Sequence, residues 1–175
     1  MIKIAITGGI GSGKSYIARQ MTELLSIPVY DSDTEAKRLN EESPQIRQGL
    51  ISLCGKDIYD ADGHLRKDRL AAYLFETEQN AQRVNALIHP VVVDDFLRWA
   101  DRQEAPIVAI ETALLVESGI DRIVDKVIRV DAPIETRIQR AMQRDGATRQ
   151  QIEARIRRQK EYPNPDMIIN NLEGC

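Results

Sequence analysis

The sequence is poor in several informative residue types. Its 175 residues include only 2 cysteines, Cys54 and Cys175, and their positions match no metal-binding or redox spacing. We therefore predict two reduced thiols and a cytoplasmic protein, because disulfides belong to oxidising compartments. The opening MIKIAITGG has a short apolar run without a small-residue cleavage site, so no secretory leader is expected. No apolar run has the length that a bilayer requires, which argues against a membrane partner.

The sequence has no excess of positive charge. The chain has 24 Lys and Arg against 27 Asp and Glu, a net charge of −3. A dedicated nucleic-acid binder needs a basic field, so we expect no nucleic-acid partner. The 42% hydrophobic and 29% charged residues are ordinary for a globular protein. This length predicts one domain, or one domain with a small insertion.

Short apolar runs recur along the chain, with helical patterns between them. Several runs are nearly continuous Ile and Val, which is typical of strands covered by helices on both faces. The alternation of strands and helices predicts an α/β fold with a five-stranded parallel sheet and right-handed crossovers. The expected strands are Lys3–Thr7, Pro28–Tyr30, Ile107–Glu111, Val127–Val130 and Met167–Ile169.

Residues 43–103 break this alternation. They predict three or four helices and no strand, with the turn DADGH between two of the helices. We therefore expect a helical subdomain over 43–103, inserted between the second and third strands. Residues 1–42 and 104–175 then form the core. An insertion at this point of a sheet enzyme tends to lie over the carboxyl edge, where ligands bind.

A glycine-rich loop follows the first strand. Its sequence GGIGSGKS, from Gly8 to Ser15, satisfies the pattern G-x-x-x-x-G-K-[ST]. Glycines let successive N–H groups turn inward, and the following helix adds its positive dipole end. Lys14 is expected to reach the β- and γ-phosphates of a nucleoside triphosphate, and the Ser15 hydroxyl to be a magnesium ligand. A turn without a ligand is the weaker alternative, because the loop lies between a strand and an amphipathic helix. The predicted nucleotide-binding residues of the loop are Gly9, Ile10, Gly11, Ser12, Gly13, Lys14, Ser15 and Tyr16.

Two aspartates follow the second strand in the run PVYDSDTEAKR. In extended chain, Asp31 and Asp33 would point the same way, on the same sheet edge as the glycine-rich loop. One carboxylate could accept or orient a hydroxyl proton, and the other could steady magnesium through water. The alternative is that both cap a helix beginning near Thr34. The phosphate loop favours catalysis for at least one of them, and Asp33 is preferred, with Asp31 as a substrate contact.

Arginines follow the fourth strand. Arg137, Arg140 and Arg144 share one helix face at i, i+3 and i+7. We predict that residues 137–160 form a basic lid that excludes water and neutralises charge, with Gly146 as a possible hinge. A solvated helix face is the alternative. Arg140 is the first choice for a catalytic arginine, and Arg144 is the second, as a nucleotide contact.

Three further polar positions are weaker candidates. Glu111 ends the third strand, where an acid could lie near magnesium, and capping or pairing is an equal alternative. Asn170 closes the last strand, where its amide could recognise the adenine edge or merely form a turn. His89-Pro90 predicts a helix junction at which Pro90 begins the next helix. No proton transfer is assigned to His89.

Five segments resemble, in order, the motifs of the dephospho-CoA kinase family: TGGIGSGKS, DSD, LIHP, ALLVESG and DMIINN. The resemblance spans nearly the whole chain. It implies a P-loop kinase fold, ATP and Mg²⁺, and transfer of the γ-phosphate to the ribose 3′-hydroxyl of dephospho-CoA in the last step of CoA synthesis. It also implies that Asp33 is the catalytic carboxylate and that His89 and the helical subdomain face the acceptor. The family's P-L-L-F-E reads ALLVE here.

Other functions remain as alternatives. A shikimate or nucleoside monophosphate kinase could share the loop, and a shikimate kinase also carries Asp-x-Asp, but would lack this long helical insertion. A nucleotide-dependent switch that uses GTP would carry Asn-Lys-x-Asp, which does not occur in this sequence.

Overall fold

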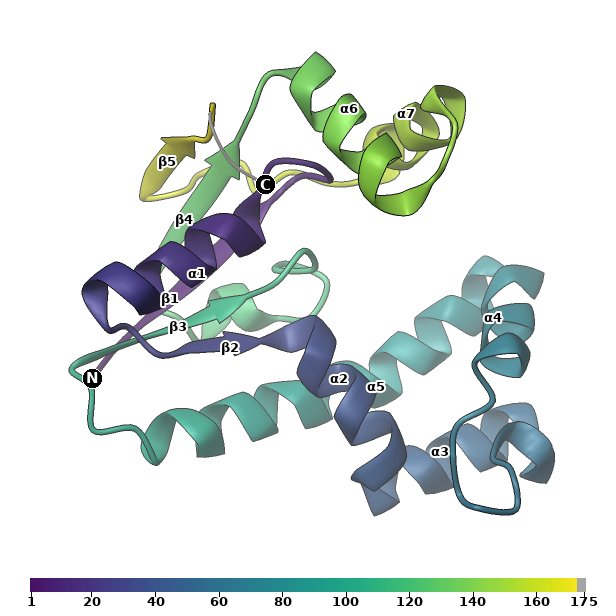
Figure 1. The fold of residues 1–175 in the computed structure, drawn as a ribbon. Coiled ribbons are helices and arrows are strands. Elements are labelled where there is room, and N and C mark those ends of the chain that lie inside the picture. Colours follow the sequence, from purple (N-terminus) through teal and green to yellow (C-terminus); the bar gives the residue numbers. More distant parts are fainter. Residues whose placement is uncertain (173–175) are drawn as a thin grey trace. The chain divides into compact units, whose positions relative to one another are not determined.

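The structure is a computed structural model that describes residues 1–172 (Figure 1). Cys175, one of the two predicted thiols, lies outside the described residues. The chain divides into two compact units. The first contains Met1–Asp31 and continues from Ala100, and the second is Ser32–Trp99. The sequence predicted that the helical unit would begin at residue 43, whereas α2 already groups with it.

The first unit is built on a five-stranded sheet with the order β2-β3-β1-β4-β5. Every pair of neighbouring strands is parallel, so all carboxyl ends meet at one edge (Figure 1). The predicted sheet is confirmed, and each strand end lies within one residue of its expected position. The strands are β1 (Ile2–Gly8), β2 (Val29–Asp31), β3 (Ile107–Glu111), β4 (Lys126–Asp131) and β5 (Met167–Asn170).

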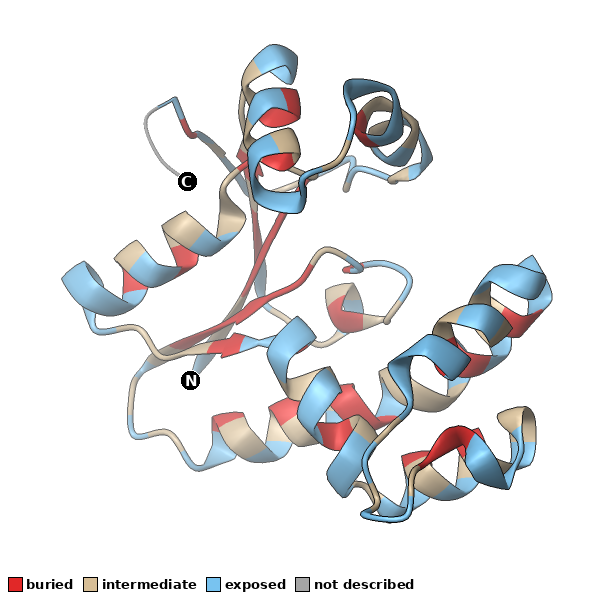
Figure 2. Cartoon of the chain, turned by 45° about the vertical axis from the view of Figure 1, so that its right-hand side comes forward, coloured by how far each residue is buried: buried red, intermediate tan, exposed pale blue. Residues whose placement is uncertain are grey.

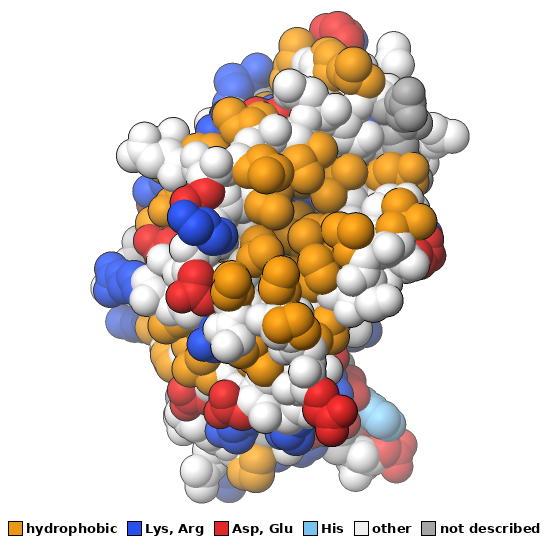
Figure 3. Space-filling model, turned by 90° about the vertical axis from the view of Figure 1, so that its left-hand side faces the viewer, with side chains coloured by type: hydrophobic (Ala, Val, Ile, Leu, Met, Phe, Trp, Pro, Cys, Tyr) orange, Lys and Arg blue, Asp and Glu red, His pale blue; other side chains and the backbone are white. Residues whose placement is uncertain are grey.

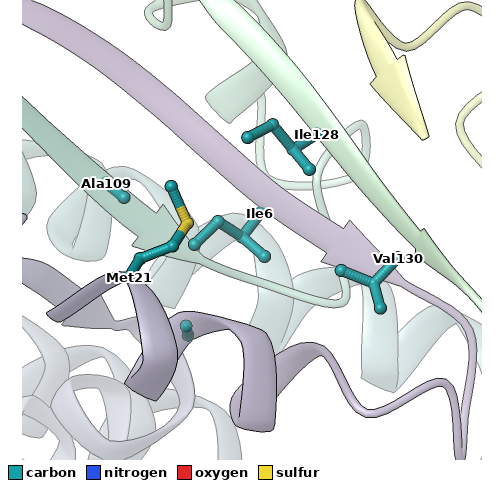
Figure 4. Packing of buried hydrophobic residues seen from close by; sticks show 6 residues of the cluster. Ile6, Met21, Ala109, Ile128 and Val130 are labelled. Carbon is teal, nitrogen blue, oxygen red and sulfur yellow. The ribbon is translucent and has the colours of Figure 1, made fainter. Parts of the chain in front are cut away.

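Helix α1 (Lys14–Leu25) covers one face of this sheet. Its apolar side packs on the central strands because Ile6 of β1 and Met21 of α1 belong to one buried cluster. Figure 4 shows the Met21 thioether reaching toward Ile6 and Ala109. Met is suited to such a place, since its unbranched side chain fills irregular gaps. This packing fixes the helix that begins directly after the glycine-rich loop.

Two helices lie between β4 and β5. Helix α6 (Ile134–Asp145) ends at Gly146, which has a left-handed φ of 62°. Helix α7 (Arg149–Arg158) begins with a capping box made by Thr148 and Gln151. The two helices lie against each other (Figure 1). A short 3₁₀ helix, η2 (Ile120–Arg122), precedes β4.

The second unit is helical, as predicted. In the DADGH turn between two of the helices, the Asp60 carboxylate accepts hydrogen bonds from the backbone N–H groups of Asp62 and His64 at 3.0 and 2.8 Å and so closes the turn. Phe96 is fully buried and stacks on Trp99, with ring centroids 6.1 Å apart. The elements are α2 (Ser32–Glu42), α3 (Pro44–Cys54), η1 (Lys56–Ile58), α4 (Lys67–Glu76) and α5 (Glu78–Asp101).

Helix α5 corrects one expectation. Pro90 does not begin a helix but lies inside α5, and His89 therefore sits within a helix rather than at a junction. Proline removes one backbone hydrogen bond at the carbonyl four residues earlier. The helix nevertheless continues because Val91, Val92 and Phe96 on its next turns are buried, so packing outweighs the local preference.

Within the first unit, most of β1, β3 and β4 is buried, and buried residues also line the helices of the second unit (Figure 2). Apolar side chains also gather on one face of the surface (Figure 3). Within residues 1–172, no helix combines the length and apolar character needed to cross a membrane. The exposed large apolar residues of the first unit include Leu24, Leu25, Met167, Ile168 and Leu172.

Candidate active site

The glycine-rich loop joins β1 to α1 in a conformation that only glycine adopts readily. Gly11 and Gly13 have φ angles of 75° and 85°, and Gly13 is the N-cap of α1. No side chain caps this helix start. The first N–H groups of α1 therefore point out of the helix end without a capping partner, as phosphate binding requires.

Lys14 and Ser15 meet an acid from a neighbouring strand. The Ser15 hydroxyl donates to Glu111 Oε1 at 2.5 Å, and Lys14 Nζ lies 3.6 Å from the same oxygen. Glu111 reaches them because β3 pairs with β1 in parallel and ends beside the loop. The side chain is nearly buried, which strengthens its interactions with the two partners. Glu111 therefore pairs with two residues of the loop, and its place beside magnesium stays a prediction.

The donor set fits a magnesium ion held together with phosphates. Mg²⁺ is usually bound by one or two carboxylates, waters and phosphate oxygens rather than by a dedicated protein cage. Ser15 Oγ and Glu111 Oε1 supply one hydroxyl and one carboxylate within 2.5 Å of each other. No cluster of three or more His, Cys, Asp or Glu occurs in residues 1–172 that would suit a metal held by the protein alone.

Helix α6 packs directly on the loop through Arg137. This side chain is buried, and its Nε donates to the carbonyl of Ile10 at 3.0 Å. A Cβ built on Gly9 would lie 1.9 Å from Arg137 Nη2, and one on Gly11 would lie 2.1 Å from the Arg137 carbonyl oxygen. Glycine at these two places therefore permits the close approach of a helix as well as of phosphate.

The end of β5 holds the other side of the loop. Asn171 is buried, and its side-chain amide donates to the Ser12 carbonyl at 3.1 Å. The backbone N–H of Asn171 donates to the carbonyl of Asp131 at the end of β4, at 2.7 Å. The fully buried Ser12 hydroxyl has no protein partner in residues 1–172. The loop is thus held from β3, α6 and β5.

A family model and two relatives of the chain carry the same name, dephospho-CoA kinase. The family model for CoaE, dephospho-CoA kinase, matches residues 2–172. The dephospho-CoA kinase of Porphyromonas gingivalis strain W83 is 49% identical over 89% of this chain and 76% of its own length. The dephospho-CoA kinase of Bacteroides fragilis strain YCH46 is 44% identical over 90% of this chain and 77% of its own.

The chain belongs to the dephospho-CoA kinase family.

Solved structures agree with the fold. TT1252 from Thermus thermophilus superimposes with a TM-score of 0.82 at 31% identity and covers 98% of this chain and 89% of its own. The dephospho-CoA kinase of Campylobacter jejuni has a TM-score of 0.66 at 20% identity, over 98% of this chain and 89% of its own. The shikimate kinase of Acinetobacter baumannii reaches 0.51 at 16% identity, which shows a shared fold only, over 99% of this chain and 86% of its own. The predicted P-loop kinase fold is confirmed.

The predicted aspartates are arranged differently from the expectation. Asp31 ends β2 and pairs in register with Glu111, so it lies at the carboxyl edge of the sheet. Helix α2 begins one residue later, and Asp33 is in its first turn. The two side chains are therefore not successive outward positions of one extended strand, because a helix rotates each residue by about 100°. An acid in a first turn also interacts favourably with the helix dipole.

The predicted lid arginines differ from one another in their contacts. Arg140 Nη1 donates to the carbonyl of Asn171 at 3.4 Å, which places it near the end of β5. Arg144 is exposed and donates to Asp145 at 2.7 Å. This hydrogen bond, with the charges of Arg144 and Arg155, lowers the pKa of the Asp145 carboxyl. In this structure Arg144 thus lies in a surface ion-pair group at the end of α6.

Two residues that contact the loop were missed by the sequence reasoning. Asn170, the predicted adenine contact, is exposed at the end of β5, and that role stays a prediction; its neighbour Asn171 is the amide that contacts the loop. Arg137 was assigned only to a shared face, although it is the arginine that contacts the loop. Burial decides both cases, and the helical spacing of three arginines does not reveal which one is buried. His89, in the second unit, is half-buried within α5.

Proposed function

We propose that the protein transfers the γ-phosphate of ATP to the ribose 3′-hydroxyl of dephospho-CoA and releases CoA and ADP. Membership of the dephospho-CoA kinase family supports the substrate pair. The observation that carries the chemistry is the convergence of Lys14, Ser15 and Glu111 at the helix end behind the glycine-rich loop. A cytoplasmic location is part of the proposal, supported by a cysteine content without a disulfide-like spacing.

The nucleotide phosphates would bind at the start of α1. The loop N–H groups and the positive end of the helix dipole attract the phosphate oxygens, and Lys14 neutralises charge on the β- and γ-phosphates. Ser15 and Glu111 would hold magnesium, which when bound supplies positive charge to the same oxygens. The arginines of α6 would complete the positive surroundings. Arg140 is proposed as the arginine that stabilises the transferring group, and Arg144 as a contact made if the lid rearranges.

Asp33 is proposed as the residue that prepares the acceptor. Its carboxylate would hydrogen-bond the ribose 3′-hydroxyl and take its proton as the bond from that oxygen to the γ-phosphorus forms. The bond between the γ-phosphorus and the oxygen that bridges to the β-phosphate breaks, and that oxygen leaves on ADP. Asp31 and His89 are proposed as acceptor contacts, Asn170 as an adenine contact, and residues 43–103 as the acceptor subdomain.

A substrate panel tests the reaction. Purified protein, ATP and Mg²⁺ are mixed separately with dephospho-CoA, shikimate and nucleoside monophosphates, and the products are identified by mass spectrometry. Phosphorylation of dephospho-CoA is expected. Turnover of another acceptor with none of dephospho-CoA would show a different kinase, and nucleotide binding without any transfer would favour a switch.

Asp33→Asn tests the proposed role of the carboxylate. We expect kcat to fall by about 10²–10⁴-fold with little change in ATP affinity, since general-base catalysis contributes that factor. Asp68→Asn is the matched control, because Asp68 is also an acid in the first turn of a helix of the second unit. Equal activities of the two variants would mean that the Asp33 carboxylate has no catalytic role and only interacts with the end of its helix.

A further inference from the structure

The side chain of Ile10 packs into the core of the helix pair α6–α7. Ile138, Ala141 and Ile152 are each at most 2% exposed and form the centre of a small cluster. Of the residues that the structure describes in this cluster, Ile10 is the one from outside α6, α7 and their connection. The residues that pack against the centre are Ile10, Met142, Ala147 and Ile156.

The backbone of Ile10 is held by the same region. Its N–H donates to Gln159 Oε1, directly after α7, at 2.7 Å. Its carbonyl accepts from Arg137 Nε, in α6, at 3.0 Å. The guanidinium of Arg137 is itself held by Glu161, with Nη1 and Oε1 3.2 Å apart. The side chain, the backbone N–H and the backbone carbonyl of Ile10 therefore all contact the lid.

The phosphate-binding motif does not require this arrangement. Ile10 occupies an unspecified position of G-x-x-x-x-G-K-[ST], where phosphate is bound by backbone N–H groups. An apolar, branched side chain adds nothing to phosphate binding, and it would be unfavourable if it were left in water beside a charged ligand. Its contacts with the lid give a physical reason for its presence.

We propose that Ile10 is a positioning residue that docks the lid, residues 137–160, onto the phosphate loop. The loop conformation and the lid position are then coupled, because neither can change without separating Ile10 from the cluster. When the lid is undocked, the loop N–H groups lose their fixed orientation. The apparent affinity for nucleotide then falls in proportion to the docked fraction. The inference rests on the proposed function only in taking a nucleoside triphosphate as the ligand.

Three variants test this coupling. Ile10→Ala removes the side chain from the cluster, and Ile10→Val keeps most of it. Ile4→Ala is the matched control, because Ile4 is also a half-buried isoleucine of the first unit but packs against α1 and the central strands. Amide hydrogen exchange is measured without nucleotide over the lid and over β1 and β3. The Kd for ATP with Mg²⁺ is measured by calorimetry.

The expected result is selective. Ile10→Ala should speed exchange in residues 137–160 and raise the Kd for ATP by roughly 10-fold, the factor expected if about a tenth of the molecules stay docked. Ile10→Val should remain within about 3-fold of the parent, since it removes a single methyl group. Ile4→Ala should lower the melting temperature but leave lid exchange and ATP affinity unchanged.

Two results would overturn the proposal. One is unchanged lid exchange in Ile10→Ala, and the other is the same acceleration in Ile4→Ala, which would mean general loss of stability. If Ile10→Ala fails to fold, Gln159→Ala provides the test, because it removes only the acceptor of the Ile10 N–H. Unaltered lid exchange in that variant would also contradict docking. Since exchange is measured without substrates, failure to phosphorylate dephospho-CoA would count against the proposed function and not against this inference.

Discussion

Alanine at Gly11 tests how closely α6 packs on the phosphate loop, and the chain supplies its own control. Gly11 and Gly119 have the same φ of 75°. A Cβ on Gly11 would lie 2.1 Å from the carbonyl oxygen of Arg137, whereas one on Gly119 would meet no described atom within 4 Å. Both substitutions therefore carry the same conformational penalty, and only Gly11→Ala adds a collision with the backbone of α6.

The two contributions can be estimated separately. A left-handed conformation costs an alanine about 1–2 kcal/mol. Overpacking that forces a backbone shift costs about 1–3 kcal/mol more. Each kcal/mol lowers the melting temperature of a protein of this size by about 2–4 °C. We therefore expect a decrease of about 2–8 °C for Gly119→Ala, and a further decrease of about 2–12 °C for Gly11→Ala.

Differential scanning calorimetry without nucleotide measures both values. Nucleotide is left out because a ligand that binds the folded state adds its own stabilisation. Gly146→Ala is a second control, since its φ is 62° and its surroundings are also open among the described residues. If Gly11→Ala melts at the same temperature as the two controls, α6 does not pack on the loop as described here.

The remaining predictions concern single side chains. Glu111→Gln should raise the Mg²⁺ concentration needed for half-maximal rate by roughly 10–100-fold, and an unchanged Mg²⁺ titration would remove Glu111 from the site. The hydrogen bond from Lys126, and then that from the Val127 N–H, lowers the pKa of Asp166. The ionised Asp166 carboxylate therefore stabilises the folded protein fully above the ordinary pKa of about 3.9, and this stabilisation is lost as the pH falls through the lower pKa of the folded state. The difference in melting temperature between the unsubstituted protein and Asp166→Asn should thus be constant from about pH 6 to 8 and disappear below about pH 4. A difference that persists in strong acid would contradict the lowered pKa of Asp166. Burial raises the pKa of the Cys54 thiol, so in a Cys175→Ser background a disulfide reagent at neutral pH should react slowly until guanidinium unfolds the chain, and rapid reaction of the folded protein would argue against it.

The sequence alone was sufficient for the sheet and the loop. Nearly continuous Ile and Val runs predicted β1, β3 and β4, because strands covered on both faces need apolar residues on both sides. The glycine-rich loop could be recognised as a phosphate-binding loop from its sequence. Positive φ angles favour glycine, and the phosphate-binding motif ends in a lysine and a serine, here Lys14 and Ser15. These features depend on neighbours along the chain. Local patterns therefore carry enough information to predict them.

Tertiary structure decided the remaining points. The local preference of Pro90 predicted a helix start, but buried side chains on the next turns keep α5 continuous through it. Helical spacing made three arginines equivalent, and only the approach of α6 to the loop distinguishes Arg137. The same holds for Asn171 beside Asn170 and for the Ile10 side chain, which packs against residues more than a hundred positions away. Contacts between distant segments depend on how helices pack on the sheet, and no single stretch of sequence contains that information.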